Sequence, residues 1–203
     1  MAIRKAAASD LDAIVRIYDA VHDQEERGMA VIGWDRKIYP TRDTARAALD
    51  RGDLFVLELN PYTETETAVC VETEMPIFRT KKTSASAETA QVIAGAAIIN
   101  QIQVDTYSQA DWAYDAAAEE VMVLHTLVID PAYGCRGLGR QFVEYYEHYA
   151  LEHGCRYLRM DTNERNARAR AMYRKLGYRE AGIVPCIFNG IPGVNLVMLE
   201  KQL

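Results

Sequence analysis

A buried strand that runs straight into a glycine-rich loop is the feature that most limits how this chain can fold. Residues 121 to 129, VMVLHTLVI, are typical of such a strand, and Pro131 ends it because proline cannot donate to a neighbouring strand. Gly134, Gly137 and Gly139 then precede a helical pattern. Glycines in this position let backbone N–H groups face an anion at the positive end of a helix. The stretch therefore predicts a phosphate-binding site between a strand and a helix.

Strands and helices alternate along the rest of the chain. Apolar runs predict strands at residues 2–5, 54–59, 92–99 and 156–162, and a pair of strands between 178 and 199. Apolar residues at helical spacing predict helices at about residues 10–27, 42–51, 142–153 and 166–176. We expect Ser9 with Asp12 to form a capping box on the first helix, and Thr41 to cap the second.

Length and composition favour one domain over residues 1–203, interrupted by an irregular insertion at about 60–90 that has no periodicity. The net charge is −6, which argues against a nucleic-acid partner. Residues 1 to 133 carry −10 (12 basic, 22 acidic) and residues 134 to 181 carry +4 (10 basic, 6 acidic). One part therefore suits a cation and the other a polyanion.

No stretch is typical of a signal peptide or a membrane span, so we expect a cytoplasmic protein with no membrane partner. The four cysteines, Cys70, Cys135, Cys155 and Cys186, lack metal-ligand spacing. We therefore expect free thiols and no bound metal.

A second motif gives the loop a specific meaning. In the segment DTNERNARARAMYRKLGYRE, the residues Asn166, Ala169, Tyr173, Gly177 and Tyr178 follow the register N-x-x-A-x-x-x-Y-x-x-x-G-[FY]. Together with the loop, this closely resembles the GNAT (Gcn5-related N-acetyltransferase) superfamily. The resemblance covers residues 121 to 178, and the outer parts match by element order only.

The loop itself fits other nucleotide motifs poorly. A Walker A loop needs Gly-Lys-Ser/Thr, where this chain has Gly139-Arg140, and a dinucleotide fingerprint needs glycine where Phe142 stands. The family's loop has the form [RQ]-x-x-G-x-G, and both glycines match at Gly137 and Gly139. Its first position is Gly134 instead of Arg or Gln, so the family's side-chain contact is not expected there. Arg136 and Arg140 are the candidates to supply its charge, and a backbone cradle needs only amides.

The resemblance implies an α/β (α+β) fold, a mixed sheet of six to seven strands with flanking helices, splayed between the fourth and fifth strands. It also implies acetyl-CoA as cosubstrate, with its diphosphate in the loop and its pantetheine arm along residues 127–129. The residues that would contact it are Leu127, Val128, Ile129, Gly134, Cys135, Arg136, Gly137, Leu138, Gly139, Arg140, Asn166, Ala169 and Tyr173. Asn166 and Asn163 are also natural helix N-caps, and capping is the alternative role for Asn166.

Acetyl transfer to an amine needs a base, an oxyanion donor and an acid. By resemblance, a backbone N–H within 127–129 is the donor and Tyr173 is the acid, although a core tyrosine would fit the same spacing. Strand alternation places His125 on the face of Leu127 and Ile129, which makes it a candidate base or a core histidine with satisfied hydrogen bonds. Glu119 and Glu120 are the competing bases. His22, His148 and His153 are expected on helix surfaces.

The acceptor site is less well defined by the sequence. By resemblance its wall would include the aromatic and thiol side chains of Trp34, Tyr39, Tyr107, Trp112, Tyr114, Cys186 and Phe188. Acidic residues would favour a cationic amine if they lined the site, although acidic loops are usually just solvated: Asp105, Asp111, Asp115, Glu119 and Glu120. We therefore expect an N-acetyltransferase for a primary amine of a small molecule or peptide. The alternative is a noncatalytic acyl-CoA-binding or interaction module, and a homodimer is among the assemblies left open.

Overall fold

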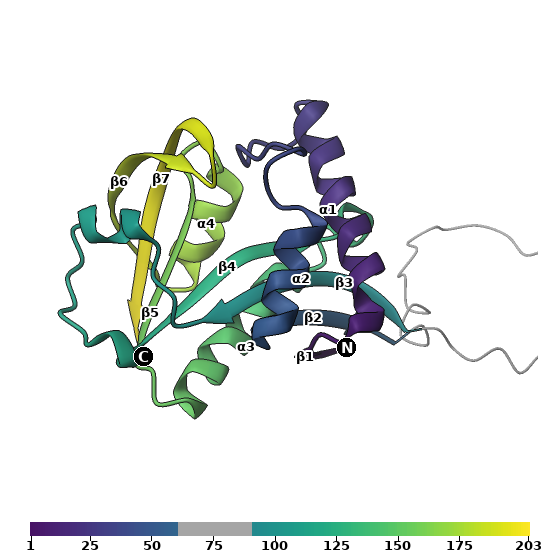
Figure 1. Cartoon of the computed structure of the whole chain (residues 1–203). Coiled ribbons are helices and arrows are strands. Elements are labelled where there is room, and N and C mark those ends of the chain that lie inside the picture. Colours follow the sequence, from purple (N-terminus) through teal and green to yellow (C-terminus); the bar gives the residue numbers. More distant parts are fainter. Residues whose placement is uncertain (61–90) are drawn as a thin grey trace, which may run out of the picture.

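The computed structural model of the chain describes residues 1–60 and 91–203, which build a seven-stranded sheet with helices on both faces (Figure 1). The strand order is β1-β2-β3-β4-β5-β7-β6. The strands are β1 (Ala2–Lys5), β2 (Leu54–Leu59), β3 (Val92–Asn100), β4 (Val121–Ile129), β5 (Tyr157–Asn163), β6 (Arg179–Phe188) and β7 (Ile191–Gln202). Neighbouring strands are antiparallel, except that β4 and β5 are parallel. The predicted mixed sheet is therefore confirmed.

The predicted insertion at 60–90 falls, apart from its first residue, outside the described residues. None of the helices in the described part of the chain is long and apolar enough to cross a membrane.

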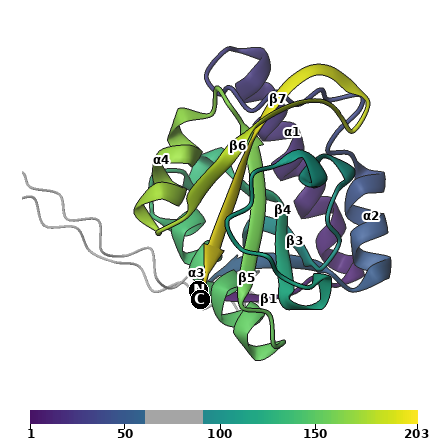
Figure 2. The ribbon, with the colours of Figure 1, turned by 90° about the vertical axis from the view of Figure 1, so that its left-hand side faces the viewer.

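In the described ranges, four α-helices cover the sheet in two layers. They are α1 (Leu11–Glu26), α2 (Arg42–Arg51), α3 (Leu138–Glu152) and α4 (Ala167–Lys175). One apolar cluster joins α1 and α2 to β2, β3 and the end of β4, and a second joins α3 and α4 to the opposite face (Figures 1 and 2). A third cluster joins β4, β6 and β7 to the segment between β3 and β4. The sheet is thus covered on both faces.

The helix ends show which local predictions hold. Thr41 caps α2 by accepting from the N–H of Thr44, and Gly52 ends that helix at φ 76°, as the sequence indicated. The capping box predicted at Ser9 is wrong, because Ser9 lies inside a 3-10 turn that precedes α1. There Asp10 accepts from the N–H of Ala7 at 2.8 Å and binds a nearby arginine.

The first helix after the loop begins earlier than its apolar pattern predicted. It starts at Leu138 instead of 142, because Gly137 takes the left-handed conformation at φ 76° and serves as the N-cap. The side chain of Leu138 is buried, which anchors this first turn. The glycine loop therefore leads directly into the helix.

The two central strands separate partway along their length. The pairs between β4 and β5 run from Val121 with Tyr157 to Leu124 with Met160. Both strands continue well beyond these pairs, β4 to Ile129 and β5 to residue 163, and they diverge visibly in Figure 1. The predicted splay between the fourth and fifth strands is thus present, and beyond it one edge of each strand has no strand partner among residues 1–60 and 91–203.

Candidate active site

A cavity of about 450 Å³ lies where β4 and β5 diverge. Leu127 and Tyr173, which line it, pack with the cluster under α3 and α4. Trp34, Ile98 and Phe188 also line it, and they belong to the clusters on the other face. The cavity is therefore reached by side chains from both faces of the sheet.

An extra residue in β4 determines which face each side chain of that strand takes. Val128 and His125 are three positions apart, yet they pair with residues of β3 that are only two apart. The extra residue is Thr126, whose φ of 51° lies in the left-handed region. Such a bulge shifts the alternation of side chains beyond it by one position.

The bulge overturns the face predicted for His125. His125 lies opposite Ile98 and so shares the face of α1 and α2, whereas Leu127 and Ile129 pack in the cluster under α3 and α4. Simple alternation failed because the sequence carries no signal for the bulge at Thr126. His125 still lines the cavity, but from the side opposite Leu127.

The surroundings of His125 favour a neutral imidazole. Its Nε2 lies 3.2 Å from Oδ1 of Asn100 and 3.0 Å from the carbonyl of Ile102, and both are acceptors. Oδ1 is assigned to this side of the amide because it also accepts from the N–H of Ile102, while Nδ2 donates to Asp53. Nε2 therefore carries the proton. Burial lowers the pKa of His125 to about 4, which makes it a weak base at neutral pH.

Asp161 is a candidate base that the sequence analysis missed. It lies on β5 just past the last pair with β4 and lines the cavity. Burial raises the pKa of Asp161 to about 6, although the hydroxyl of Tyr107, which donates to Oδ2 at 2.9 Å, opposes the shift. In the described part of the chain, Oδ1 has no hydrogen-bond partner. One carboxylate oxygen is thus held in place and the other is available.

The signal for Asp161 was present but ambiguous. It is the single acidic residue in the strand YLRMDTN, where a surface position would explain it equally well. Its partner Tyr107 is 54 positions away in the segment before β4, and no pattern connects the two.

Tyr173 reaches the cavity from α4. The residue is buried at 6% exposure, and its ring packs edge-on against Tyr178 with centroids 5.9 Å apart. Within the described ranges, its hydroxyl has no hydrogen-bond partner, and it is not among the buried polar atoms cut off from the surroundings. Burial raises the pKa of Tyr173 well above its usual range, with the charge of Asp161 adding to the effect. The phenol therefore keeps its proton at neutral pH.

The other candidate bases lie elsewhere. Glu119 and Glu120 are exposed in a 3-10 turn, Ala118–Glu120, that precedes β4. Glu120 lies five positions before His125, which corresponds to roughly 16 Å along a strand. Neither glutamate lines the cavity, so the structure does not bring them together with Tyr173.

The glycine-rich loop has the geometry of an anion site. Cys135 and Gly137 both have left-handed φ values, 62° and 76°, and a backbone of this kind turns successive N–H groups to one side. The first hydrogen bond of α3 runs from the N–H of Gln141 to the carbonyl of Gly137. The N–H groups of residues 138–140 precede that bond and have no acceptor within the helix. The loop thus presents several donors at the positive end of α3.

The exposed edge of β4 adds two backbone donors. The N–H of Asp130 points to β3, where it donates to the carbonyl of Ala94 at 2.9 Å. Backbone groups alternate along a strand, so those of Ile129 and Leu127 point to the opposite edge. That is the edge from which β5 has diverged.

Asn166 is confirmed as a helix cap. Its side-chain oxygen accepts from the N–H of Ala169 at 3.2 Å, while its Nδ2 lies 3.3 Å from the hydroxyl of Thr162. Asn163 instead accepts from the N–H of Arg165. Asn166 and Ala169 both line the cavity, and a contact with a bound molecule remains a prediction.

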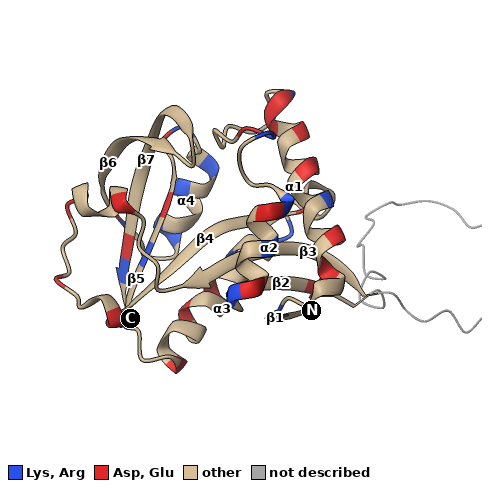
Figure 3. Cartoon of the chain, viewed as in Figure 1, with Lys and Arg blue, Asp and Glu red and all other residues tan. Residues whose placement is uncertain are grey.

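Basic residues gather beside the loop. Helix α4 contains three arginines and a lysine and no acidic residue, in contrast to the acidic α1 (Figure 3). Arg168 of α4 donates to the sulfur of Cys135 at 3.4 Å, so the start of α4 lies against the loop. Arg140 is exposed and pairs with Glu144 on the next turn. Part of the positive balance that the sequence indicated, Arg140 and Arg168, therefore lies near the predicted phosphate site, whereas Arg170 and Arg174 pair with Glu180 of β6.

Part of the predicted acceptor wall lines the cavity. Trp34, Tyr39 and Phe188 form a continuous aromatic series, with centroids 5.9 Å apart in the first pair and 5.3 Å in the second. The hydroxyl of Tyr39 also contacts Thr126. The remaining predicted wall residues do not line the cavity: Tyr107, Trp112, Tyr114 and Cys186.

The displaced residues have other contacts. Tyr107 is buried beneath the cavity wall with its hydroxyl on Asp161, and Trp112 packs against the guanidinium of Arg159 at 4.3 Å. Tyr114 lies beside Tyr157. The acidic residues of this segment are exposed and outside the cavity lining, which confirms the solvated alternative: Asp105, Asp111, Asp115, Glu119 and Glu120.

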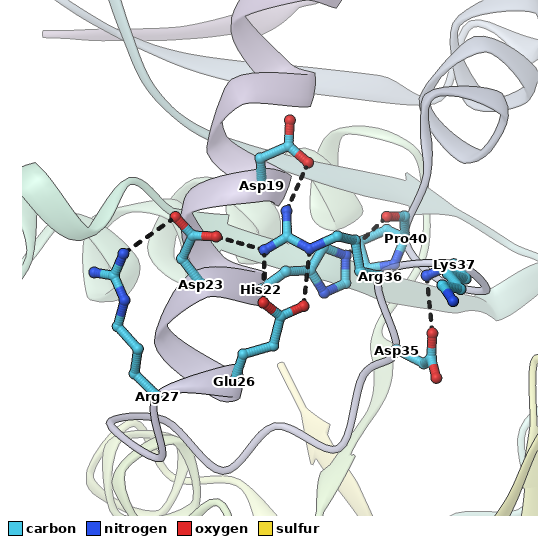
Figure 4. Close-up of polar contacts among 9 residues, drawn as sticks. All are labelled: Asp19, His22, Asp23, Glu26, Arg27, Asp35, Arg36, Lys37 and Pro40. Atoms are coloured by element: carbon cyan, nitrogen blue, oxygen red, sulfur yellow. Dashed lines mark hydrogen bonds and ion pairs between the residues drawn. The ribbon is translucent and has the colours of Figure 1, made fainter.

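Ion pairs hold the loop that carries Trp34 and Tyr39 against α1. Arg36 binds three carboxylates of α1, with Nη1 3.1 Å from Asp19, Nε 2.8 Å from Glu26 and Nη2 on Asp23 (Figure 4). His22 was expected on the surface but is buried, and its ring nitrogen lies 3.1 Å from the carbonyl of Pro40. That expectation failed because the loop folds back over this turn of α1.

Comparison with known proteins agrees with this geometry. Residues 52–178 match the family profile described as "Acetyltransferase (GNAT) family". No protein among the curated sequences matches the chain.

Solved structures share the fold. An acetyltransferase of the GNAT family from Streptococcus agalactiae is 20% identical, with a TM-score of 0.69 over 100% of this chain and 95% of that one. The yncA structure from Salmonella typhimurium, solved with its cofactor acetyl-CoA, is 18% identical with a TM-score of 0.61 over 100% and 94%. A ribosomal-protein-alanine N-acetyltransferase from Brucella melitensis is 16% identical, with a TM-score of 0.61 over 100% of both chains.

Proposed function

This chain belongs to the GNAT family of acetyltransferases, and from that premise we propose that it transfers the acetyl group of acetyl-CoA to a primary amine. The observation that carries the proposal is the cavity between β4 and β5, into which Tyr173 and Asp161 reach from opposite faces of the sheet. One residue is a protonated phenol and the other is a carboxylate with a raised pKa. Their different environments thus make Tyr173 a proton donor and Asp161 a proton acceptor near neutral pH.

The glycine loop and the edge of β4 fit acetyl-CoA. We place the diphosphate at residues 134–140, where the left-handed turns at Cys135 and Gly137 and the start of α3 direct N–H groups outward. A backbone cradle does not need the Arg or Gln that Gly134 replaces. The pantetheine arm then follows residues 127–129 along the unpaired edge, as an added strand would. A neighbour of the same fold was solved with acetyl-CoA, which supports this choice.

The chain's own groups can perform the remaining steps. An ammonium ion must lose a proton before its nitrogen can attack, and Asp161 accepts that proton on its available oxygen. As the new C–N bond forms at the thioester carbon, the N–H of Leu127 or Ile129 stabilises the oxyanion. When the C–S bond breaks, Tyr173 donates its proton to the departing sulfur. The nitrogen passes its second proton to the Tyr173 phenolate, which restores the phenol, and Asp161 releases the first proton to solvent.

We assign the base to Asp161 in preference to His125. The imidazole has a pKa of about 4, so its basicity is too weak for a protonated amine at neutral pH. Asp161 titrates about two units higher and has an oxygen available for the amine. His125 would then shape the wall through its bonds to Asn100 and Ile102.

The experiment combines binding with turnover. Titration calorimetry measures association of acetyl-CoA, and release of free thiol is then followed across a panel of primary amines. We expect binding together with amine-dependent thiol release. Binding with no thiol release for any amine would favour the noncatalytic acyl-CoA module, and absence of binding would remove the basis of both functions.

A further inference from the structure

We propose that the acceptor is an amine on an apolar or aromatic body that carries no acidic group beside the amine, so that a free amino acid is rejected. This deepens the proposed function and rests on it. The charges and rings that line the cavity carry the inference.

The first argument concerns charge. Among the described residues that line the cavity, the ionisable side chains besides the tyrosines are Arg51, His125 and Asp161. His125 donates through Nε2 to two acceptors, and burial lowers its pKa so that it is neutral at pH 7, which leaves one cation and one carboxylate.

The cation is already neutralised. Arg51, at the end of α2, binds both oxygens of Asp53, with Nε at 2.9 Å and Nη2 at 3.3 Å. Asp53 is buried at 8% exposure and is further fixed by the amide of Asn100 at 2.7 Å. A ligand carboxylate at Arg51 would share the guanidinium with this buried aspartate, so the pair as a whole would offer it little net positive charge.

The carboxylate, in contrast, is available. Oδ2 of Asp161 accepts from Tyr107, and Oδ1 has no partner in the described part of the chain. An ammonium group can therefore pair with Asp161, whereas a carboxylate on the neighbouring carbon would lie close to a like charge without a counterion. Burying a charge in that way is strongly unfavourable.

The second argument concerns the rest of the acceptor. Trp34, Tyr39 and Phe188 form the aromatic series described above, and Val194 and Leu196 of β7 extend the apolar wall. Edges and faces of rings accept apolar bodies and also attract cations. The acceptor side of the cavity therefore suits a hydrophobic monoamine, or the amine of a residue whose carboxyl group is in amide linkage.

The test compares three forms of one molecule at a single pH with saturating acetyl-CoA. Tyramine has no carboxyl group, tyrosine has a charged one, and tyrosinamide has the same bulk without the charge. We expect kcat/KM for tyramine and tyrosinamide within about tenfold of each other, and that for tyrosine at least about 100-fold lower. Phenethylamine, phenylalanine and phenylalaninamide should give the same order.

Each outcome separates the inference from the function on which it rests. Equal activity with tyrosine and tyramine overturns the inference and leaves the acetyltransferase proposal intact. Tyrosinamide as poor as tyrosine also overturns it, because bulk and not charge would then explain the rejection. If acetyl-CoA binds but no amine of either series releases thiol, the proposed function fails and the inference fails with it.

Discussion

Leu124 of β4 and Met160 of β5 are the last paired residues of the two parallel strands at the centre of the sheet. Beyond them the strands diverge, and the residues that follow each one, His125 and Asp161, line the same cavity. Two reactants can therefore approach each other through the sheet. The carrier would lie on the side of α3 and α4, and the acceptor on the side of α1, α2 and the β6–β7 hairpin.

Replacing Tyr173 with phenylalanine should slow turnover without weakening acetyl-CoA binding. The variant keeps the ring that packs in the core and removes only the proton donor, so we expect kcat to fall about 100-fold. Calorimetry and thiol release measure the two quantities separately. Tyr178→Phe is the matched control, because Tyr178 packs beside Tyr173 but does not line the cavity. Unchanged kcat in Tyr173→Phe would refute the acid role.

The pH profile should report Asp161. A base acts in its deprotonated form, so kcat/KM should rise with pH through about 6 and fall about tenfold per unit below it. Asp161→Asn should lower kcat/KM by about 100-fold or more and remove this limb. Asp115→Asn, an exposed carboxylate outside the cavity, is the control and should keep the wild-type profile. Persistence of the limb near pH 6 in Asp161→Asn would move the base elsewhere.

Asp161 should also be visible in folding stability, independently of activity. Its pKa is higher in the folded protein than in the unfolded chain, so ionisation destabilises the fold as pH rises from about 4 to about 6. Above that range the cost is constant, and below it the cost is absent. Asp161→Asn removes this cost. We therefore expect the free energy of unfolding of the variant, relative to wild type, to increase by on the order of 1 to 3 kcal/mol when the pH is raised from 4 to 7. Denaturant unfolding at both pH values measures the difference; a constant difference would contradict the raised pKa.

Gly137→Ala should weaken acetyl-CoA binding. At φ 76° a Cβ costs roughly 1 kcal/mol, and relief of that strain would turn the loop's N–H groups away, so we expect Kd to rise about fivefold to tenfold. Gly154→Ala is the control. It has nearly the same φ, 77°, has nothing within 4 Å of the new Cβ, and lies at the far end of α3. It should lose similar stability with no change in Kd; equal effects of both variants on Kd would show that the loop conformation is not specifically required.

Arg36 should position the acceptor wall. Loss of its three contacts with α1 frees the loop that carries Trp34 and Tyr39, so Arg36→Ala should raise KM for the amine roughly threefold to tenfold. KM for acetyl-CoA should not change, and Arg36→Lys should restore part of the loss. Arg27→Ala is the control, because Arg27 also meets Asp23 but lies on the end of α1 itself. A parallel rise of both KM values would instead indicate general loosening.

Most of the framework could be predicted from local patterns. Thr41, Gly52 and the apolar runs define their elements through nearest neighbours in sequence, which is why those boundaries agree with the structure. The splay between the central strands was expected only by resemblance, because no local pattern specifies where two strands stop pairing.

The site was harder to predict because its key relationships join distant residues. Tyr107 and Asp161 are 54 positions apart, and the raised pKa of the carboxyl group exists only once the segment before β4 covers β5. His125 looked like the better base because an isolated imidazole titrates near neutrality. Burial, however, lowers its pKa and so weakens it as a base. Alternation also assumed an unbroken ladder, and Thr126 breaks it.

The bulge at Thr126 determines which side chains of β4 face each of the two proposed reactants. If Thr126 were instead part of a regular ladder, every residue beyond it would turn to the other face, so that Leu127 and Ile129 would point to the side of α1 and α2 and Val128 to the side of α3 and α4. The edge amides would exchange directions as well. Which side chains face each side of the cavity is therefore set by the bulge, and a change that flattened the backbone at Thr126 would be more damaging than most changes of side chain.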